Sequence, residues 1–316
     1  MSTTDLRLRL ESYLSLRQAL GFSMRATTSR LNDFVEFIEE KGHSGPITAQ
    51  LAVEWSCATA STCGAAGQAQ RLSMVRCFLS HLRATVPETE IPDKGLLAKT
   101  PRPTPYIYSP TEIQNLLTAA SLLEPEGSLR PHTFRTLIGL LASTGLRSGE
   151  AIRLTVTDVQ LDLGPPRLLV RETKFRKSRI VPLHATTAAR LRRYSKERAR
   201  LGYDAQADAF FISEQRRPLR YFEVRRTFET LRRGLGITTA NGRTPKLHGL
   251  RHTFAVQRLL TWYREGADVK ASLPNLSVYL GHVCPQDSYW YLTATPELLS
   301  AAAASFQTYA NTGGAA

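Results

Sequence analysis

Prolines concentrate in one stretch of this chain and divide it into two parts. Between residues 84 and 108 the prolines are Pro87, Pro92, Pro101, Pro103 and Pro105, with small polar residues among them. Proline lacks a backbone N–H and restricts the residue before it, so no helix continues through such a stretch. We therefore predict an extended linker of limited flexibility over 89–108, between a domain at 1–88 and a domain at 109–316. A chain of 316 residues is long enough for two separate cores.

The first predicted domain shows helical periodicity throughout. Apolar residues recur at helical spacing, and they predict four helices that begin near Leu6, Leu31, Thr48 and Gln68. Four arginines in this part are candidates for phosphate contacts, although each is equally consistent with a solvated surface charge: Arg25, Arg30, Arg71 and Arg76.

The second predicted domain mixes helices with a short β-region. Ser109-Pro110-Thr111-Glu112 has the Ser cap, the Pro at the first helical position and the Glu of a capping box. From Thr155 to Leu183 the periodicity shortens to that of three strands, with the basic stretch 174–177 in the second turn. Helices are predicted at about 134–142, 185–200, 220–235, 247–263 and 276–281, with a last helical pair bracketing Tyr291. The fold class is thus mainly α with a small antiparallel β-sheet, in two domains.

Charge is distributed unevenly between the two parts. The net charge is +14 with a pI of about 10.0; residues 1–100 carry 11 Lys and Arg against 10 Asp and Glu, whereas residues 101–316 carry 30 against 17. This asymmetry indicates that the second part faces a polyanion. Arginine outnumbers lysine, which favours bidentate contacts to phosphate. A membrane partner is disfavoured, because no run of 18 apolar residues and no signal-peptide core is present, and we expect a cytoplasmic protein.

Cysteine usage agrees with a reducing compartment. Cys57, Cys63, Cys77 and Cys284 show no CxxC pattern and no regular spacing. Cys57 and Cys63 have no nearby His or acid to complete a metal site, so buried or incidental thiols are expected. No carboxylate cluster suited to a two-metal nuclease is evident, and neither a metal nor a cofactor is predicted.

Five short elements in the second part bear candidate functional side chains. TGLRSGE contains Arg147, ETKFRKSRIVPL contains Lys174, LHGLRHTF places His248 three residues before Arg251, and LGH places His282 nine residues before Tyr291. Each has an ordinary alternative: a helix cap, a turn lysine, a surface helix face, a core histidine or a packed aromatic ring. A helical spacing of three puts the His248 and Arg251 side chains on one face, where imidazole and guanidinium suit a phosphate oxygen.

Together these motifs resemble those of the tyrosine recombinase (phage integrase) family. Their order and spacing agree with the family over roughly residues 109–294, and Glu150 matches the acidic neighbour of the first arginine. The helical N-terminal part is similar to the family's core-binding domain in architecture only. The resemblance identifies Arg147, Lys174, His248, Arg251, His282 and Tyr291 as catalytic residues, with Arg176, Lys177 and Arg179 as further DNA contacts.

The chain departs from the family pattern at three points. Glycine usually flanks the hairpin lysine, but here Thr173 and Phe175 do, which makes Lys177 a reserve candidate for the role of Lys174. The segment before LGH is longer than usual, suggesting a small insertion near 270–274. Tyr289 also lies close to His282, but at the wrong distance, so Tyr291 is the expected nucleophile.

The resemblance implies a metal-free phosphoryl transfer. Tyr291 would attack a DNA phosphorus to form a 3′-phosphotyrosine, with the non-bridging oxygens clamped by Arg147 and Arg251. His248 would act as general base toward Tyr291 or hold it by a hydrogen bond, His282 would hydrogen-bond the phosphate, and Lys174 would protonate the 5′-oxygen. A tyrosine hydroxyl has an ordinary pKa of about 10, so it needs such help at neutral pH.

The resemblance also implies an assembly. Four protomers would join two double-stranded DNA sites through a Holliday junction, and the segment from about Thr295 to Tyr309 would dock on a neighbouring protomer or pack within its own domain. The ending YWYLTATPELL favours a member carried by a mobile element. Two alternatives stay open: a catalytically inactive DNA-binding accessory factor, and an enzyme that relaxes DNA like a type IB topoisomerase. The choice of DNA site depends on a few side chains in the grooves and on DNA deformability.

Overall fold

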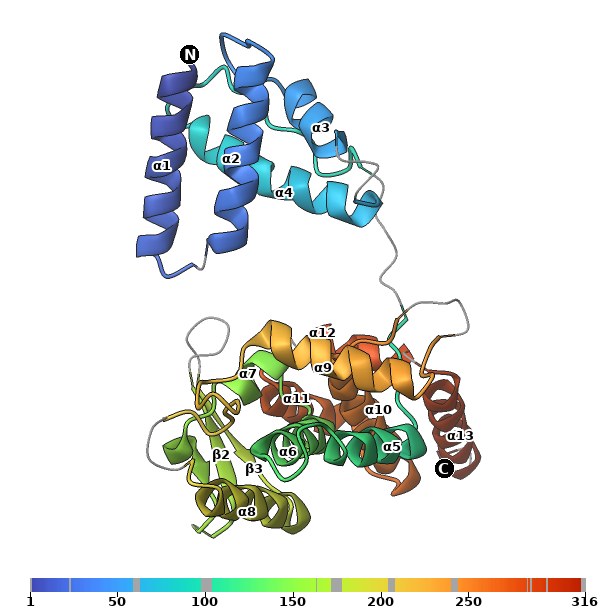
Figure 1. The fold of residues 1–316 in the computed structure, drawn as a ribbon. Coiled ribbons are helices and arrows are strands. Elements are labelled where there is room, and N and C mark those ends of the chain that lie inside the picture. The colour runs from blue at the N-terminus through green and yellow to red at the C-terminus, as the bar shows by residue number, and fades with distance from the viewer. Residues whose placement is uncertain are drawn as a thin grey trace. The chain divides into compact units, whose positions relative to one another are not determined.

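The computed structural model forms two compact units, residues 1–103 and 104–316. It describes residues 2–22, 24–58, 63–97, 104–162, 164–171, 178–203, 208–239, 244–282, 284, 286–293 and 295–313. Figure 1 shows the helices and strands of both units. Among the described residues, no helix combines the length and the apolar character that crossing a bilayer requires.

The N-terminal unit is a bundle of four helices, as the periodicity predicts. They are α1 (Thr3–Ala19), α2 (Arg25–Glu40), α3 (Ala49–Cys57) and α4 (Ala65–Leu82). The core between them is built from large side chains that are fully buried, such as Phe34, Trp55 and Phe78. The rings of Phe34 and Trp55 meet edge to face with centroids 5.3 Å apart, an arrangement that aromatic quadrupoles favour.

The proline-rich stretch is only partly an extended connection. Thr89 is buried, Ile91 and Leu97 pack on the helical core, and the Glu90 N–H donates to the Ile47 carbonyl at 2.9 Å. Helix α4 ends at Leu82, before Pro87, and backbone and apolar contacts hold the following chain on the bundle. The boundary between the compact units, after Pro103, falls inside the predicted range 89–108.

The C-terminal unit is helical around a three-stranded antiparallel sheet of order β1-β2-β3. Its strands are β1 (Val159–Gln160), β2 (Arg167–Val170) and β3 (Arg179–Pro182), with Leu168 opposite Val181. Its helices are α5 (Pro110–Ser121), α6 (Leu129–Thr144), α7 (Ser148–Ile152), α8 (Ala185–Arg200), α9 (Tyr221–Gly234), α10 (Gly249–Arg264), α11 (Val269–Leu280), α12 (Gln286–Tyr289) and α13 (Pro296–Gly313). The predicted fold class, mainly α with a small antiparallel sheet, is confirmed.

Three local features differ from the prediction. The first strand is short, because Thr155 and Asp158 cap each other and turn residues 156–158 into a 3-10 helix. The five-residue helix α7 was not predicted. Helix α11 begins at Val269 instead of near residue 276, and the expected insertion at 270–274 is part of this helix, with Pro274 inside it.

The last helix packs within its own chain. Leu298 near the start of α13 is fully buried, and Ala301 lies against the same core as Val256 and Leu259 of α10. Leu299 is about half exposed. The side chains of Phe306 and Tyr309, in the segment predicted to dock on a neighbouring protomer or to pack within its own domain, lie outside the described residues.

Candidate active site

A left-handed turn carries the first candidate arginine into the site. Helix α6 ends at Gly145 with φ +62, where an added Cβ would come within 2.5 Å of the Phe254 ring. Glycine alone fits this turn without strain. Arg147 follows at the N-terminus of α7, where its Nη1 donates to Glu150 Oε1 at 2.8 Å and its Nη2 donates to the Gly281 carbonyl at 3.0 Å.

The second candidate arginine is enclosed by backbone carbonyls. Arg251 of α10 is 2% exposed; its Nη1 donates to the Gly145 carbonyl and its Nη2 to the Leu280 carbonyl, both at 2.8 Å. Burial and then the charge of Arg147 lower the pKa of Arg251 to about 10. The guanidinium therefore stays charged at neutral pH. Its burial costs free energy, and a bound anion would offset that cost.

Histidine and tyrosine rings gather beside this arginine. The His248 ring, at the exposed start of α10, meets the His252 ring edge to face at 4.7 Å. The Tyr291 ring lies 5.6 Å from the ring of His252 and 6.0 Å from that of His282, nearly parallel to the latter. Nδ1 of His282 lies 2.7 Å from Oγ of the buried Ser288.

Of the two neighbouring tyrosines, Tyr291 is the one inside this cluster. It is 2% exposed, in the short 3-10 helix Trp290–Thr293, and its phenol is close enough to Arg251 to raise the pKa of that guanidinium against burial. Tyr289 is 52% exposed. Tyr289 lies seven and Tyr291 nine residues after His282, and this two-residue difference separates a surface ring from an interior ring.

Glu150 lies under two arginines. Its buried carboxylate accepts from Arg147 and also from Arg179 of β3, whose Nη2 reaches Oε2 at 2.8 Å and whose Nη1 reaches Oε1 at 3.2 Å. Burial alone would raise the pKa of Glu150, but the hydrogen bonds and charge of Arg179, followed by the bonds to Arg147, outweigh it and lower the pKa to about 2. Glu150 is therefore ionised at any physiological pH.

The remaining predicted site residues are only partly described. Lys174, Arg176 and Lys177 and the side chain of Arg25 lie outside the described residues, so their roles stay predictions. Arg30 is half-buried in α2.

Two other predicted phosphate contacts have structural partners in the N-terminal unit. Arg71 is 7% exposed, with its guanidinium 3.8 Å over the ring of Trp55. Arg76 donates to the carbonyls of Pro92 and Asp93 at 2.7 and 2.8 Å. These bonds hold the proline-rich stretch on α4, and phosphate contacts by these arginines stay untested.

Three features of the site were not predicted from the sequence. His252 follows Arg251 directly, and nothing in a single sequence shows that its ring lies between those of His248 and Tyr291. Ser288 is an ordinary serine in sequence, six residues from the histidine that it contacts. Arg179 was expected on DNA, whereas its guanidinium is bonded within the protein.

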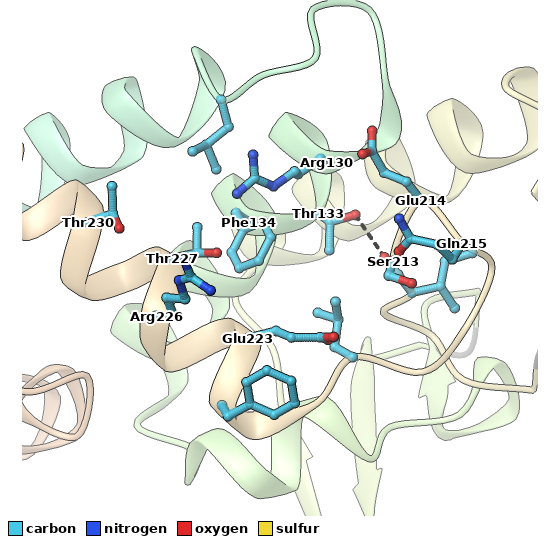
Figure 2. A pocket seen from close by; sticks show the side chains of 14 residues that line it. Arg130, Thr133, Phe134, Ser213, Glu214, Gln215, Glu223, Arg226, Thr227 and Thr230 are labelled. Atoms are coloured by element: carbon cyan, nitrogen blue, oxygen red, sulfur yellow. Dashed lines mark hydrogen bonds between the residues drawn. The ribbon is translucent and has the colours of Figure 1, made fainter.

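A separate hollow of about 550 Å³ opens between α6, α9 and the segment 212–219 (Figure 2). Arg130 and Arg226 line it together with Glu214 and Glu223, so its charges balance, and none of the predicted site residues lines it. Within the part of the chain that the structure describes, no three His, Cys, Asp or Glu side chains are grouped to hold a metal ion.

Comparisons with known proteins agree with this geometry. The model of the phage integrase family matches residues 108–297, more than half of the chain. The putative integrase/recombinase y4rB of Sinorhizobium fredii is 41% identical over 302 residues, covering 94% of this chain and 95% of that protein. The tyrosine recombinase XerD of Caulobacter vibrioides is 28% identical over 215 residues, covering 68% of this chain and 66% of that protein.

Solved structures share the fold at low sequence identity. The XerH site-specific recombinase bound to a palindromic difH substrate, in a post-cleavage complex, has a TM-score of 0.68 at 20% identity, covering 97% of this chain and 85% of that one. The Tn1549 transposon integrase in complex with transposon right end DNA has a TM-score of 0.67 at 14% identity, covering 96% and 99%. These likenesses show the fold. The family match and the 41% identical relative show that the chain belongs to the phage integrase family, the tyrosine recombinases, which are DNA strand-transferases.

Proposed function

We propose that this protein is a site-specific DNA recombinase that cuts and rejoins DNA through a covalent 3′-phosphotyrosine. The observation that carries this function is the convergence of Arg147, Arg251, His282 and Tyr291 at the ends of four elements in one unit. Two guanidinium groups beside an interior phenol can bind the non-bridging oxygens of a phosphodiester, and they can do so without a metal ion.

In the proposed cleavage step, the Tyr291 oxygen forms a bond to phosphorus as the bond from phosphorus to the 5′-oxygen breaks. The phenolic proton passes to His248 or to water, and the 5′-oxygen takes a proton from Lys174, with Lys177 in reserve. The phosphodiester energy is kept in the phosphotyrosine. A 5′-hydroxyl from another strand then reverses the step and releases Tyr291.

Arg147 and Arg251 stabilise the charge that develops on the non-bridging oxygens. Each is oriented before DNA arrives, because carbonyls of Gly145, Leu280 and Gly281 fix the guanidinium planes. Donors fixed in advance do not have to reorganise during the reaction, which is the main source of electrostatic catalysis. His282, held by Ser288, adds a hydrogen bond to the same phosphate in this scheme.

The other parts of the chain serve DNA binding and assembly in this proposal. The N-terminal helical unit acts as the core-binding domain, with Arg25, Arg30, Arg71 and Arg76 as phosphate contacts, and Arg176 contacts DNA near the lysine. Four protomers exchange strands between two duplex sites through a Holliday junction, in the cytoplasm and in the service of a mobile element. One solved relative in fold is a lambda integrase tetramer bound to a Holliday junction, and another is a transposon integrase.

The test is covalent trapping on DNA. Duplexes covering the flanks of the chain's own gene are nicked near each candidate cleavage position, so that a short strand diffuses away and leaves the phosphotyrosine trapped. The unaltered protein and Tyr289→Phe are expected to form a denaturation-resistant adduct, and Tyr291→Phe none. Plasmids with and without the reactive site are then tested for recombination and for relaxation.

Each outcome bears on one function. Adducts and recombinants only at particular sites support the recombinase. Relaxation of plasmids that lack the site indicates a topoisomerase, and sequence-specific binding without an adduct indicates an accessory factor. An adduct that survives in Tyr291→Phe contradicts the proposed nucleophile.

A further inference from the structure

Arg179, the first residue of β3, has every guanidinium nitrogen engaged within the protein. Nε donates to the Tyr279 carbonyl at 2.9 Å, and Nη1 and Nη2 donate to the two oxygens of Glu150 at 3.2 and 2.8 Å. The side chain is 11% exposed and that of Glu150 is 2% exposed. A planar fork that meets a carboxylate with two bonds in this way fixes position and angle together.

The same helix end holds three arginines through three consecutive carbonyls. Arg179 donates to the carbonyl of Tyr279, Arg251 to that of Leu280, and Arg147 to that of Gly281. The three arginines come from β3, α10 and the start of α7. The end of α11 therefore sets the relative placement of the two proposed phosphate ligands and of the first residue of β3.

The residue at the end of α11, Gly281, must be a glycine for Arg179 to lie where it does. Gly281 ends α11 with φ +69, and an added Cβ would lie 2.6 Å from Arg179 Nη1 and 2.9 Å from its Cζ. The guanidinium thus lies directly against the turn that leads to His282. A side chain at this position would displace Arg179.

The position of Arg179 in the chain gives this contact a consequence for the proposed proton donor. Lys174 lies five residues before Arg179, in the segment that joins β2 to β3. Five extended residues span at most roughly 18 Å. Fixing the Arg179 end of the segment therefore limits where the lysine can reach relative to Arg147 and Arg251.

We propose that Arg179 is a positioning residue for strand cleavage, which ties the segment carrying Lys174 to the carboxylate and helix end that hold the two phosphate arginines. This positioning role takes the place of the DNA contact that the sequence predicts for Arg179. It rests on the proposed function, because it requires Lys174 or Lys177 to protonate the leaving 5′-oxygen.

The test uses a leaving group that needs no proton. Single-turnover cleavage is measured on the nicked duplex that forms the adduct, with either oxygen or sulfur as the atom that bridges the scissile phosphorus and the 5′-carbon of the leaving strand. Thiolate leaves without protonation because its pKa is far below that of an alcohol. The proteins are the full chain, Arg179→Met, Arg179→Lys, Lys174→Ala, Lys177→Ala and the matched control Arg171→Met.

Arg171 is a suitable control because it flanks the same segment from the β2 side. It pairs with Asp158 through an exposed guanidinium and, among the described residues, makes no hydrogen bond to the carbonyls of α11. Arg171→Met is expected to cleave both substrates within about threefold of the unaltered protein.

With oxygen as the leaving atom, both Arg179 variants are expected to be about 100-fold slower, the cost of misplacing a general acid. With sulfur they are expected to recover to within about threefold of the unaltered protein. Equal slowing on both substrates overturns the proposal. So does an unchanged rate with weaker, less salt-dependent DNA binding, which indicates a phosphate contact instead.

Two further measurements separate this inference from its foundations. If neither lysine variant shows rescue by sulfur, the proposed general acid is wrong, and with it the basis for Arg179. If a lysine variant is rescued and the Arg179 variants are not, only the positioning role fails. Amide hydrogen exchange of the protein without DNA checks its folding. Faster exchange confined to 178–182 and 279–282 is expected in Arg179→Met, and to a smaller extent in Arg179→Lys. Faster exchange throughout the C-terminal unit contradicts a local role.

Discussion

The charge network around Glu150 makes a quantitative prediction. Replacing Glu150 with Gln removes the buried negative charge that Arg147 and Arg179 share. A pKa of about 2 in place of 4.5 corresponds to about 3 kcal/mol in favour of the charged form, at about 1.36 kcal/mol for each pKa unit. In other proteins, removing one partner of a buried ion pair lowers the folding stability by about 3–5 kcal/mol, so the two figures agree. We expect Glu150→Gln to lower the free energy of unfolding of the C-terminal unit by about 3 kcal/mol at pH 7.

The assay is urea unfolding followed by tryptophan fluorescence. Trp262 and Trp290 report on the C-terminal unit and Trp55 on the other, so two transitions can be assigned. As a control, Glu197→Gln removes a partly exposed carboxylate that is paired with the exposed Arg200, and it should leave the transition of the C-terminal unit nearly unchanged.

The pH dependence separates this explanation from a simple packing defect. The folded-state pKa of Glu150 lies below its unfolded value, so the stabilisation is complete above pH 4.5 and is lost as the pH falls from 4.5 toward 2. The difference between the unaltered protein and Glu150→Gln should therefore be constant from pH 7 to about 5 and shrink below it. A difference under about 1 kcal/mol at pH 7, or one that does not change down to pH 3, would refute the reasoning.

Three further changes test other contacts. Gly281→Ala forces a left-handed backbone and a contact with Arg179, and should lower the unfolding free energy by about 1–3 kcal/mol in the same urea assay; no change contradicts the close approach. Ser288→Ala removes the partner of His282 and should slow adduct formation roughly tenfold with little loss of stability, as single-turnover trapping will show. Arg251→Lys cannot bridge two carbonyls and should slow trapping by at least about 100-fold at saturating DNA; an undiminished rate excludes Arg251 as a phosphate ligand.

The sequence predicted the elements that local chemistry specifies. Ser109 and Glu112 form the predicted capping box at the start of α5, and Gly145 forms the predicted turn before Arg147. Thr155 and Asp158 carry the same kind of capping signal, yet the alternation of apolar residues around them was interpreted as a strand. The local signal was present and the longer-range pattern obscured it.

Other features depend on tertiary contacts and were not predictable. The sequence predicts a small insertion near 270–274 and a helix from about residue 276, but the Asp268 cap starts α11 at Val269, and Val269 and Leu273 are buried in its first turns. The bond from Arg179 to Glu150 joins residues 29 positions apart. Basic residues next to a predicted hairpin are usually assigned to DNA, and nothing in the sequence distinguishes one that turns inward.

The end of α11 explains why so many arginines can share one small region without DNA. The last carbonyls of a helix lack intrahelical partners and carry the negative end of its dipole, so they accept hydrogen bonds from cations well. Arg147, Arg179 and Arg251 satisfy three of these carbonyls, while Glu150 balances one of their charges. The region keeps a net positive charge beside Tyr291, which a phosphodiester would neutralise. A site whose donors are held by carbonyls and not by further carboxylates retains its affinity for an anion, and this makes the helix end, together with the arginines, the basis of the proposed catalysis.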